Sequence, residues 1–385
     1  MKKFNSLFLK VNYFNSYHLK ILLKDLFRLK YKVYSNEFHL DKAISWLIYA
    51  KNKTSNGGIS LGYSLISGWK PSYPETSGYI IPTIFNYIRS SKNRIHYKIC
   101  KDIANWLIDL QLKNGSFPEG TINEKPKPSI FNTGQIIFGL ISSYEEFEES
   151  RFLVSLIKAG DFLVKYQEKN GNWVKYCYQN ISHTYNIRTA WALLKLYNIT
   201  DKEYYKESAI RNINWAIQQI NENFWFKNNI HSAFENPILH FIAYTIEGFL
   251  ECGIILKNEK ITNIALNSAK KLLDYYEYYG ILPASFDSDW NSYDTYSCLT
   301  GDAQISIIWL KLYEIFKEKR FLVNAIKLNN FLKSTQINEN NFKAIDGAIK
   351  GSDPIWGNYL TFTFPNWAVK FFCDALLLEK KILNL

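Results

Sequence analysis

Asn114-Gly115-Ser116-Phe117 is a short turn that returns along the chain as Asn170-Gly171-Asn172-Trp173. In both copies an Asn-Gly pair follows an apolar helical pattern and leads into a large aromatic residue. Related turns stand at Asn56-Gly57-Gly58-Ile59, Asn223-Phe224-Trp225 and Tyr279-Gly280-Ile281-Leu282. The copies are about 55 residues apart, which indicates one repeating unit along the chain. We expect the glycine to cap the preceding helix in the left-handed region and the next apolar residue to turn the loop back under the rim.

Between the turns, apolar residues recur with the 3.6-residue period of α-helices in about twelve segments, and no long stretch alternates as a strand would. The expected helices lie near residues 40–53, 77–91, 96–112, 132–147, 151–168, 186–198, 202–220, 237–252, 260–278, 299–316, 319–335 and 365–380. Long connections of roughly 16 to 29 residues follow every odd helix, and most of the others are only a few residues long. Helices connected in this way form six hairpins.

Six such hairpins predict an all-α (α/α)6 toroid, because each hairpin reverses the chain direction and brings all the long loops to one face. The helices after the long loops are apolar on nearly every side and should form an inner ring around a central hole, closed at one end by side chains and short turns. Their partners keep a polar stripe and should form an outer ring. We expect one toroid domain at residues 37–385, preceded by a basic, helical segment at residues 1–36.

The formal net charge of +11 is concentrated at the N-terminus. Residues 1–36 contain eight Lys or Arg against Asp25 alone, which leaves about +4 for the rest of the chain. Between His18 and Tyr34, leucines and Phe27 stand at helical spacing beside lysines. This helix could lie on an anionic membrane surface or pack against the toroid, and packing is favoured. The basic stretch is short, terminal and outside any known nucleic-acid-binding fold, which argues against a nucleic-acid partner.

No apolar run reaches the roughly 20 residues that span a bilayer, and the N-terminus lacks the apolar core of a secretory signal. We therefore expect a cytoplasmic protein, with peripheral contact to the inner membrane through residues 1–36 as the open alternative. The five cysteines stand far apart without CxxC spacing, and the six histidines form neither HxH nor HExxH. Buried free thiols, no metal site and no cofactor are expected.

Polar residues stand at the N-terminal ends of the otherwise apolar inner helices, where burial without partners is costly. In chain order they are Tyr73, Glu75, Thr76, Tyr79, Asn132, Thr133, Gln135, Tyr185, Asn186, Arg188, His240, Tyr244, Cys298, Thr300, Asp302, Gln304, Asn366 and Trp367. We interpret them as the mouth of a site in the central hole. Several helix N-termini directed at one cavity favour an anionic ligand such as a uronate or a phosphate.

Several stretches resemble known toroid families. Gln111 to Phe117 and Gln167 to Trp173 resemble the QW repeats of terpenoid cyclases, and the hairpin series resembles the six-hairpin glycosidase superfamily. A closer resemblance, over residues 40–380, is to an uncharacterised family encoded in bacterial surface-polysaccharide clusters. It is carried by WKPSYPETSGYIIPT (69–83), FNTGQIIFGL (131–140), IRTAWALL (187–194), LPASFDSDW (282–290), CLTGDAQISIIWLKLY (298–313), GSDPIWGNY (351–359) and FPNWAVKFFCDAL (364–376). The resemblance implies work on an acidic or lipid-linked oligosaccharide and specifies no reaction.

Other toroid chemistries fit the residues less well. Squalene cyclases are known for a DxDD-type acid, and the nearest approach, Asp287-Ser288-Asp289, is expected in a loop. Cys298 with His240 does not match a prenyltransferase-type zinc set, and the paired Cys and His-Gly motifs of lanthionine cyclases are absent. A terpenoid-type cyclase, in which aromatic faces of a dry cavity stabilise carbocations, stays as an alternative.

Two carboxylate positions predict hydrolysis of a glycosidic bond. Glu75 follows Pro74 at the start of an inner helix, and Asp287 and Asp289 lie in the fifth long loop. A carboxylate pair across a sugar, here Glu75 with Asp289, supplies one acid for the leaving oxygen and one base for water. The alternatives are a favourable helix-start position for Glu75 and a turn-forming role for the aspartates.

A uronate lyase or C5-epimerase is the second enzymatic hypothesis. His240 and Tyr244 stand at i and i+4 on one helical face, where they could act as base and acid, unless His240 is simply hydrogen-bonded. Arg188 projects from an apolar helix, so its charge needs a carboxylate on the protein or on the substrate. The remaining expected substrate-binding residues are Tyr73, Tyr79, Gln135, Asp287, Trp290, Thr300, Gln304 and Trp367.

The sequence therefore predicts a carbohydrate-active enzyme of bacterial surface-polysaccharide metabolism, with Glu75, Asp289, His240 and Tyr244 as its catalytic residues. A non-catalytic glycan-binding toroid is the alternative from a different class. In that case aromatic side chains of the long loops, rather than carboxylates, would carry the function. The tryptophans in or beside these loops are Trp69, Trp173, Trp225, Trp290, Trp356 and Trp367.

Overall fold

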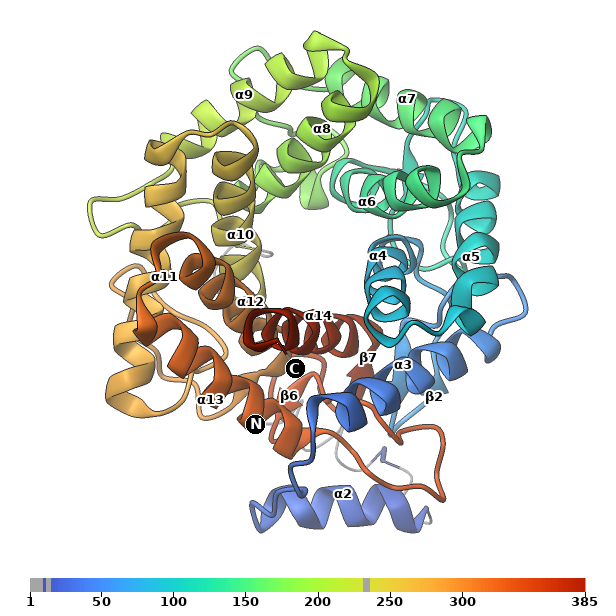
Figure 1. The fold of residues 1–385 in the computed structure, drawn as a ribbon, viewed down its shortest axis with the longest axis vertical. Coiled ribbons are helices and arrows are strands. Elements are labelled where there is room, and N and C mark those ends of the chain that lie inside the picture. Colours follow the sequence, from blue (N-terminus) through green and yellow to red (C-terminus); the bar gives the residue numbers. More distant parts are fainter. Residues whose placement is uncertain (1–9, 12–14, 231–235, 385) are drawn as a thin grey trace.

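The chain folds into a ring of helices around a central axis (Figure 1). The computed structural model describes residues 10–11, 15–230 and 236–384. Its α-helices are α2 (Ser16–Leu26), α3 (Asn36–Asn52), α4 (Pro74–Ser91), α5 (Tyr97–Leu110), α6 (Ile130–Phe147), α7 (Ser150–Lys165), α8 (Ile187–Thr200), α9 (Glu203–Ile217), α10 (Leu239–Ile255), α11 (Glu259–Tyr279), α12 (Leu299–Phe316), α13 (Lys319–Thr335) and α14 (Asn366–Leu383). Single-turn helices are η1 (Arg94–His96), η2 (Tyr178–Asn180) and η3 (Thr184–Asn186). The predicted all-α fold is confirmed, since α3 to α14 match the twelve expected segments.

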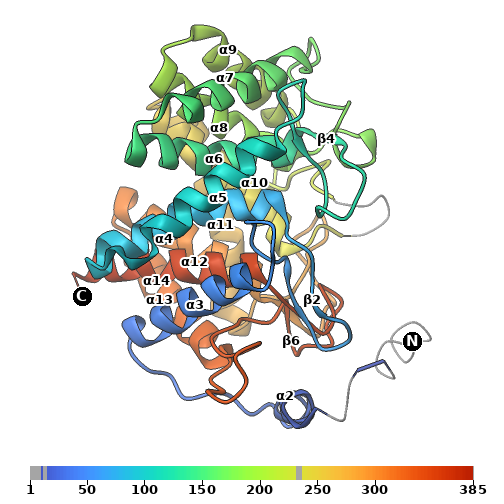
Figure 2. The same cartoon turned by 90° about the vertical axis from the view of Figure 1, so that its right-hand side faces the viewer.

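These twelve helices form two concentric rings. The inner helices α4, α6, α8, α10, α12 and α14 each pack against the next, and α14 packs against α4 to close the ring (Figure 1). The outer helices α3, α5, α7, α9, α11 and α13 lie behind them. In α12, every residue from Leu299 to Leu310 is buried, which explains why its sequence is apolar on nearly all sides. Figure 2 shows the long loops on one face and the C-terminus on the other.

Short strands tie the long loops together. They are β1 (Gly62–Ser64), β2 (Gly68–Trp69), β3 (Phe117–Pro118), β4 (Pro128–Ser129), β5 (Ser297–Cys298), β6 (Ser352–Asp353) and β7 (Thr363–Pro365). The order β2-β1-β7 forms one antiparallel sheet, in which Tyr63 lies opposite both Trp69 and Phe364. The strands β3 and β4 form a second pair, and β5 and β6 a third. Because β1 lies in the first long loop and β7 in the last, the larger sheet joins the two ends of the ring.

A glutamine at the start of the repeated turns links neighbouring outer helices. Gln111 Nε2 donates hydrogen bonds to the carbonyl oxygens of Gly115 in its own turn and of Ser155 on α7, both at 2.9 Å. Gln167 repeats this pair of bonds one hairpin later at the same distances. Gln336 makes the equivalent bonds at 3.0 Å to the turn after α13 and to α3. The repeat therefore continues across the closure of the ring.

The glycines of these turns allow a close approach between backbones. Gly115 and Gly171 have φ of +92° and +95°, and a Cβ on either would lie 2.2 Å from a carbonyl oxygen of the next outer helix. The prediction that they cap the preceding helix is wrong, because α5 and α7 end several residues earlier. Gly280 does cap α11, as predicted. The apolar residues that follow the turns are buried as predicted: Ile59, Phe117, Trp173, Trp225 and Leu282.

The N-terminal helix α2 packs along the outside of the ring. It begins at Ser16 and ends at Leu26, well before Tyr34, so the helical spacing overestimated its length. The chain leaves the helix at Arg28, which has φ of +53°. The Asp25 carboxylate is held there by Lys350. Residues 1–9 and 12–14 of the predicted basic segment lie outside the described residues. In the described parts of the chain, the helices are too short or too polar to cross a bilayer.

Candidate functional site

A cavity of about 330 Å³ opens among the long loops, at the N-terminal ends of the inner helices. We call it the long-loop cavity. It is lined by Tyr73, Glu75, Thr76, Tyr79, Glu119, Ser129, Phe131, Asn132, Cys177, Tyr178, Tyr185, Asn186, Ile238, His240, Phe241, Tyr244, Tyr359, Leu360 and Trp367. These residues come from the first two turns of α4, α6, α10 and α14 and from the loops beside them. The cavity thus lies at the end of the ring where the sequence places polar helix starts.

Glu75 is the most buried carboxylate in the lining of this cavity. It is the second residue of α4 and follows Pro74, which suits the first position of a helix. Glu75 is 7% exposed and accepts a hydrogen bond from the Tyr73 hydroxyl at 2.7 Å. Burial raises the pKa of Glu75 to about 7, although the Tyr73 hydrogen bond and the charge of Arg188 act to lower it. Near neutral pH this carboxyl group is therefore present in both protonated and ionised forms.

His240 and Tyr244 lie side by side on α10, with ring centroids 4.2 Å apart. His240 Nδ1 is 2.6 Å from Gln304 Oε1. Because an amide oxygen only accepts hydrogen bonds, Nδ1 donates in this contact, and in the neutral ring Nε2 carries the lone pair. Burial and the charge of Glu75 raise the pKa of the Tyr244 hydroxyl, which therefore keeps its proton at neutral pH.

Aromatic rings form much of the remaining wall. Trp367 Nε1 donates to the Tyr359 hydroxyl at 2.8 Å, which holds the indole against the cavity. Across the cavity, the Tyr185 ring packs against Phe131 and Phe241 at centroid distances of 5.1 and 5.2 Å. Such rings present rigid contact area to a ligand. Of the loop tryptophans, Trp367 lines the cavity, whereas Trp173 belongs to the core and Trp290 to the packing of the fifth loop.

A layer of buried side chains closes the middle of the ring below this cavity. Arg188 is 2% exposed, and its Nε donates to Gln135 Oε1 at 2.9 Å. Its guanidinium group also pairs with Glu247 and lies 4.5 Å from the centre of the Tyr244 ring. Burial acts to raise the pKa of Glu247, but Arg188 and two lysines outweigh it and hold the pKa at about 2. Arg188 therefore has its carboxylate partner within the protein.

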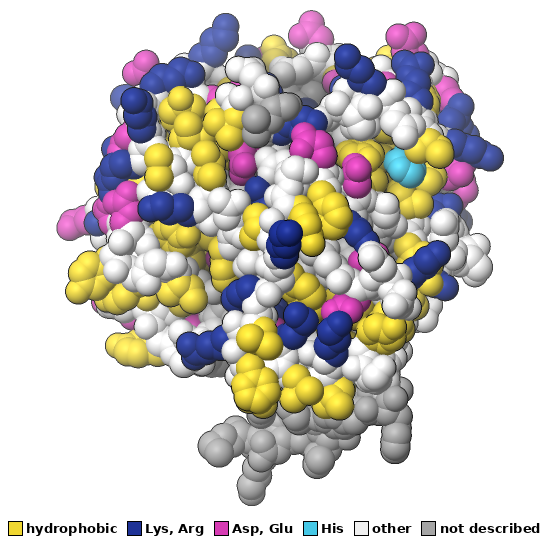
Figure 3. Space-filling model, turned by 60° about the horizontal axis from the view of Figure 1, so that its bottom comes forward, with side chains coloured by type: hydrophobic (Ala, Val, Ile, Leu, Met, Phe, Trp, Pro, Cys, Tyr) yellow, Lys and Arg dark blue, Asp and Glu magenta, His cyan; other side chains and the backbone are white. Residues whose placement is uncertain are grey.

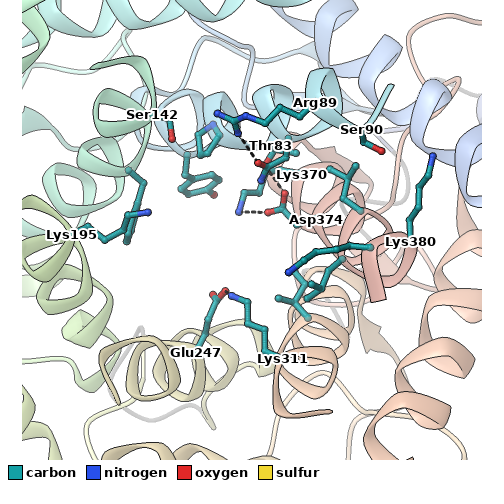
Figure 4. Close-up of a pocket in the computed structure, with 18 of the residues that line it drawn as sticks. Thr83, Arg89, Ser90, Ser142, Lys195, Glu247, Lys311, Lys370, Asp374 and Lys380 are labelled. Carbon is teal, nitrogen blue, oxygen red and sulfur yellow. Dashed lines mark hydrogen bonds and ion pairs between the residues drawn. The ribbon is translucent and has the colours of Figure 1, made fainter. Parts of the chain in front are cut away.

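The ring is hollow on both sides of this layer. A second cavity, of about 810 Å³, opens at the face of the short turns (Figure 4). Tyr79 lines both cavities, whereas Arg188 lines the second one and not the first. The expectation that side chains and short turns close this end is wrong. The closure lies midway, because large side chains of the inner helices, such as Tyr79 and Tyr244, meet there.

The structure places the predicted residues of the fifth long loop outside the long-loop cavity. Asp289 is exposed, and its backbone N–H donates to Asp287 Oδ1 at 2.9 Å. The N–H of Asn291 donates to the same oxygen at 2.8 Å, so Asp287 closes a local turn. Trp290 Nε1 donates to the carbonyl oxygen of Asn223 at 3.1 Å. None of the three predicted residues lines the cavity, and Asp289 is not brought opposite Glu75.

The other predicted residues divide between the lining and the layer behind it. Tyr73, Tyr79 and Trp367 line the cavity. Gln135 and Gln304 are buried behind it, where they bind Arg188 and His240. Thr300 is also fully buried on α12.

Glu119 is the charged lining residue that the sequence analysis missed. It follows Phe117 and Pro118, directly after the repeated turn that opens the second long loop. Its backbone N–H donates to the carbonyl oxygen of Lys127 at 2.8 Å, beside the β3–β4 pair, and its side chain is half-buried. The repeat marks the start of the first five long loops, so an acid just beyond it was a usable signal.

The long-loop cavity combines two carboxylates, an imidazole and several phenols. Among the described residues its lining contains no Lys or Arg, so the groups there that favour an anion are the N-termini of the inner helices. In the described ranges, no group of three or more His, Cys, Asp or Glu could hold a metal ion. All five cysteines are buried. This set of groups is suited to acid–base chemistry on a bound molecule.

Solved structures share this architecture over most of the chain. An unsaturated glucuronyl hydrolase specific for heparin matches with a TM-score of 0.70 at 12% identity, over 91% of this chain and 98% of that one. The fold is the six-hairpin (α/α)6 toroid. The cellobiose 2-epimerase of Spirochaeta thermophila gives 0.71 at 12% identity over 89% and 95%, and the unsaturated glucuronyl hydrolase of Bacillus sp. GL1 gives 0.67 at 13% over 88% and 96%. No family model and no curated protein matches the chain.

Proposed function

We propose that the long-loop cavity hydrolyses a glycosidic bond in an acidic oligosaccharide. The observation that carries the proposal is the buried carboxyl of Glu75, whose pKa of about 7 lets it hold a proton at neutral pH. A second carboxylate, Glu119, lines the same cavity. Glycosidic-bond hydrolysis needs one carboxyl group that donates a proton and one that activates water.

Glu75 is the proposed general acid. Its proton goes to the leaving glycosidic oxygen while the bond from that oxygen to the anomeric carbon breaks. Glu119, the more exposed of the two, takes a proton from the water whose oxygen forms the new bond to the anomeric carbon. Tyr73 donates its hydrogen bond to the Glu75 carboxylate that remains. Asp289, the second carboxylate expected from the sequence, has no part in this scheme because it does not line the cavity.

The helix N-termini at the cavity wall support an acidic substrate. Inner helices begin at this wall, and each N-terminus carries a partial positive charge that favours an anion. One hydrolase with the same fold is described as responsible for the degradation of glycosaminoglycan. The stretches that resemble the surface-polysaccharide family extend the proposal to cytoplasmic surface-polysaccharide metabolism.

The test measures new reducing ends released from uronate-containing and neutral oligosaccharides. The wild type should act on the uronate-containing set, and Glu75→Gln and Glu119→Gln should each lower kcat by at least about 100-fold. Asp289→Asn is the matched control: it also neutralises a loop carboxylate and should leave kcat within about twofold. Binding without product in the wild type would replace the hydrolase with the glycan-binding alternative.

The pairing of His240 with Tyr244 favours a uronate lyase or epimerase as the second candidate. His240 Nε2 would remove the proton beside the uronate carboxylate, and Tyr244 would protonate the leaving oxygen or the opposite face of the carbanion. A 2-epimerase occurs among the proteins with this fold. An unsaturated product absorbing in the ultraviolet, or deuterium taken up from heavy water at the epimerised carbon, would support this chemistry. Either signal should vanish in His240→Gln and persist in Glu75→Gln.

We further propose that α2 brings the protein to an anionic membrane, where a lipid-linked substrate would lie. One face of α2 packs against the toroid through His18, Ile21 and Leu22. The other face and the residues after it expose apolar side chains, at 42% to 66%: Leu19, Leu23, Leu26, Phe27 and Leu29. Basic residues stand among them: Lys20, Lys24, Arg28, Lys30 and Lys32. Figure 3 shows hydrophobic and basic side chains adjoining on this edge of the molecule, a combination that binds anionic lipid surfaces.

Co-sedimentation with lipid vesicles tests this contact. The protein should bind vesicles that contain phosphatidylglycerol, bind phosphatidylcholine vesicles weakly, and dissociate as salt rises. A double variant, Leu26→Glu with Phe27→Glu, should abolish binding without changing Tm, since both side chains are exposed. Ile95→Glu is the matched control, because Ile95 is also exposed but lies elsewhere. Undiminished binding by the double variant would exclude this face.

A further inference from the structure

The second cavity carries most of its charge as lysine and arginine, and we call it the basic cavity. It lies at the short-turn face, across the closing layer from the long-loop cavity, and has a volume of about 810 Å³. Its charged lining residues are Arg89, Arg188, Lys195, Lys311, Lys370, Lys380 and Lys381 against Glu247 and Asp374. Figure 4 shows Lys195, Lys311 and Lys370 directed towards the hole from α8, α12 and α14. The proposed hydrolysis makes no use of this cavity.

Helix polarity explains only part of this charge. Cations at the C-terminal end of a helix offset the negative end of its dipole. Arg89 in the last turn of α4 and Lys380 in the last turn of α14 fit that role. Lys370 does not, because it lies in the second turn of α14, far from its C-terminus. Lys311 likewise projects from the interior of α12.

The cations deepest in the basic cavity are Arg188, Lys311 and Lys370, and an equal number of carboxylates pairs with them. The ion pairs are Arg188 with Glu247, Lys311 with Glu247 at 3.3 Å and with Glu251 at 2.6 Å, and Lys370 with Asp374 at 2.7 Å. Lys195 adds a further positive charge, since no ion pair joins it to the described residues. It is half-exposed on α8 and reaches in across the hole from Asp374 (Figure 4). The floor and wall of the cavity therefore carry an excess positive charge.

The cations at the rim can turn towards a ligand. They pair with carboxylates that do not line the cavity: Arg89 with Glu146, Lys380 with Glu37, and Lys381 with Glu314. At least one side chain of each pair is exposed: Arg89 at 55%, Glu37 at 50% and Lys381 at 71%. Exposed ion pairs contribute about 0 to 1 kcal/mol, so exchanging such a carboxylate for an anionic ligand has little cost.

The uncharged part of the wall adds aromatic rings. Trp191 and Phe138 lie there with ring centroids 4.4 Å apart and their planes tilted by 52°. Hydroxyl and amide groups of Thr83, Asn86, Ser90 and Ser142 also line the cavity. Several compact ammonium groups around one space suit a phosphate, which offers oxygens to several donors at once. An aromatic wall beside them suits a sugar or a base.

We propose that the basic cavity binds an organic phosphate, such as a sugar phosphate, at a site separate from the long-loop cavity. The phosphate group contacts Lys195 together with the lysines across the hole, and the organic part lies against Trp191. This site does not depend on the proposed hydrolysis. It makes the toroid a protein with one ligand site at each end of its axis.

Calorimetric titration of the full chain with glucose 6-phosphate, inorganic phosphate, glucuronate and glucose tests the site. Glucose 6-phosphate should bind most tightly, with a Kd that rises with salt. Lys195→Gln should weaken this binding at least about fivefold. Lys169→Gln removes an exposed lysine from a turn on the long-loop face and should leave the Kd unchanged. Glu75→Gln should also leave it unchanged, which separates this site from the proposed catalytic one.

Three outcomes would overturn the proposal. The first is the absence of phosphate binding by a wild type whose circular dichroism shows a folded helical protein. The second is an equal loss in Lys195→Gln and Lys169→Gln, because it would indicate nonspecific charge. The third is tighter binding of glucuronate than of glucose 6-phosphate, because it would replace the phosphate with a carboxylate ligand.

Discussion

The Tyr73 hydroxyl donates a hydrogen bond of 2.7 Å to Glu75 Oε2, at a point where Glu75 is only 7% exposed. The two residues flank Pro74, so the extended backbone of Tyr73 and the first turn of α4 set their relative positions. The bond stabilises the ionised carboxylate and therefore opposes the effect of burial on its pKa. Burial and this hydrogen bond, together with the charge of Arg188, set the pH at which Glu75 changes charge.

Tyr73→Phe should move the pH profile of the enzyme upward. Loss of the hydrogen bond removes an interaction with the ionised form, so the pKa of Glu75 rises above about 7. If Glu75 is the acid, the alkaline limb of kcat/KM should shift up by about one pH unit. The measurement is kcat/KM between pH 5 and 9. Tyr293→Phe, at an 88% exposed position, is the control. An alkaline limb that does not shift in Tyr73→Phe would refute the role of the Tyr73–Glu75 hydrogen bond.

The ionised Glu75 carboxylate should lower the free energy of unfolding above neutral pH. Its pKa is about 7 in the folded chain against an ordinary value of 4.5, so the folded state binds more protons between these values. Stability therefore falls as pH rises through that window, by on the order of 3 kcal/mol at about 1.4 kcal/mol per pKa unit. Glu75→Gln lacks this cost and should show a higher Tm than the wild type at pH 8. At pH 5 the two Tm values should nearly coincide, and a difference that does not change with pH would contradict the assignment.

The ring was predictable because its signals are local and repeated. Each hairpin displays an apolar face with helical period, and the repeated turns mark where five of the six long loops begin, so α3 to α14 followed from the sequence. The polar starts of the inner helices also pointed to the end of the ring where the long-loop cavity opens. Glu75 was found in this way, since its position depends only on the start of α4.

The sequence pattern could not identify the second carboxylate of the long-loop cavity. Asp289 and Glu119 both follow an aromatic residue in a long loop, and periodicity says nothing about which acid turns inward. The backbone decides it: Asp287 binds the N–H groups after it and closes its own turn, whereas β3–β4 pairing leads Glu119 to the cavity. Glu247, the partner of Arg188, lies one hairpin further on, and the packing of α10 against α8 brings the two together.

Glu247→Gln should destabilise the protein strongly. The variant leaves the Arg188 charge buried without its carboxylate, and breaking a buried pair in this way costs about 3 to 5 kcal/mol. Because the pKa of Glu247 is held at about 2, its contribution is present above the ordinary value of 4.5 and is lost as pH falls towards 2. Urea unfolding at pH 7 and at pH 3 measures both effects. Glu251→Gln, which removes a more exposed partner of Lys311, should cost less than about 1 kcal/mol, and an equal cost would refute the special role of Glu247.

Alanine substitutions at the turn glycines distinguish two costs in the free energy of unfolding. One is the cost of a positive φ, and the other is the clash of an added Cβ with the next outer helix. Gly115, Gly171 and Gly280 all have positive φ, so alanine at each costs about 1 kcal/mol for conformation alone. A Cβ at Gly280 meets nothing within 4 Å, but at Gly115 it would lie 2.2 Å from the carbonyl oxygen of Lys158, and at Gly171 as close to that of Arg211. The turn would have to move off the next outer helix, so Gly115→Ala and Gly171→Ala should cost about 3 kcal/mol or more in urea unfolding. An equal loss in Gly280→Ala would mean that conformation, rather than contact between hairpins, keeps glycine in the repeat.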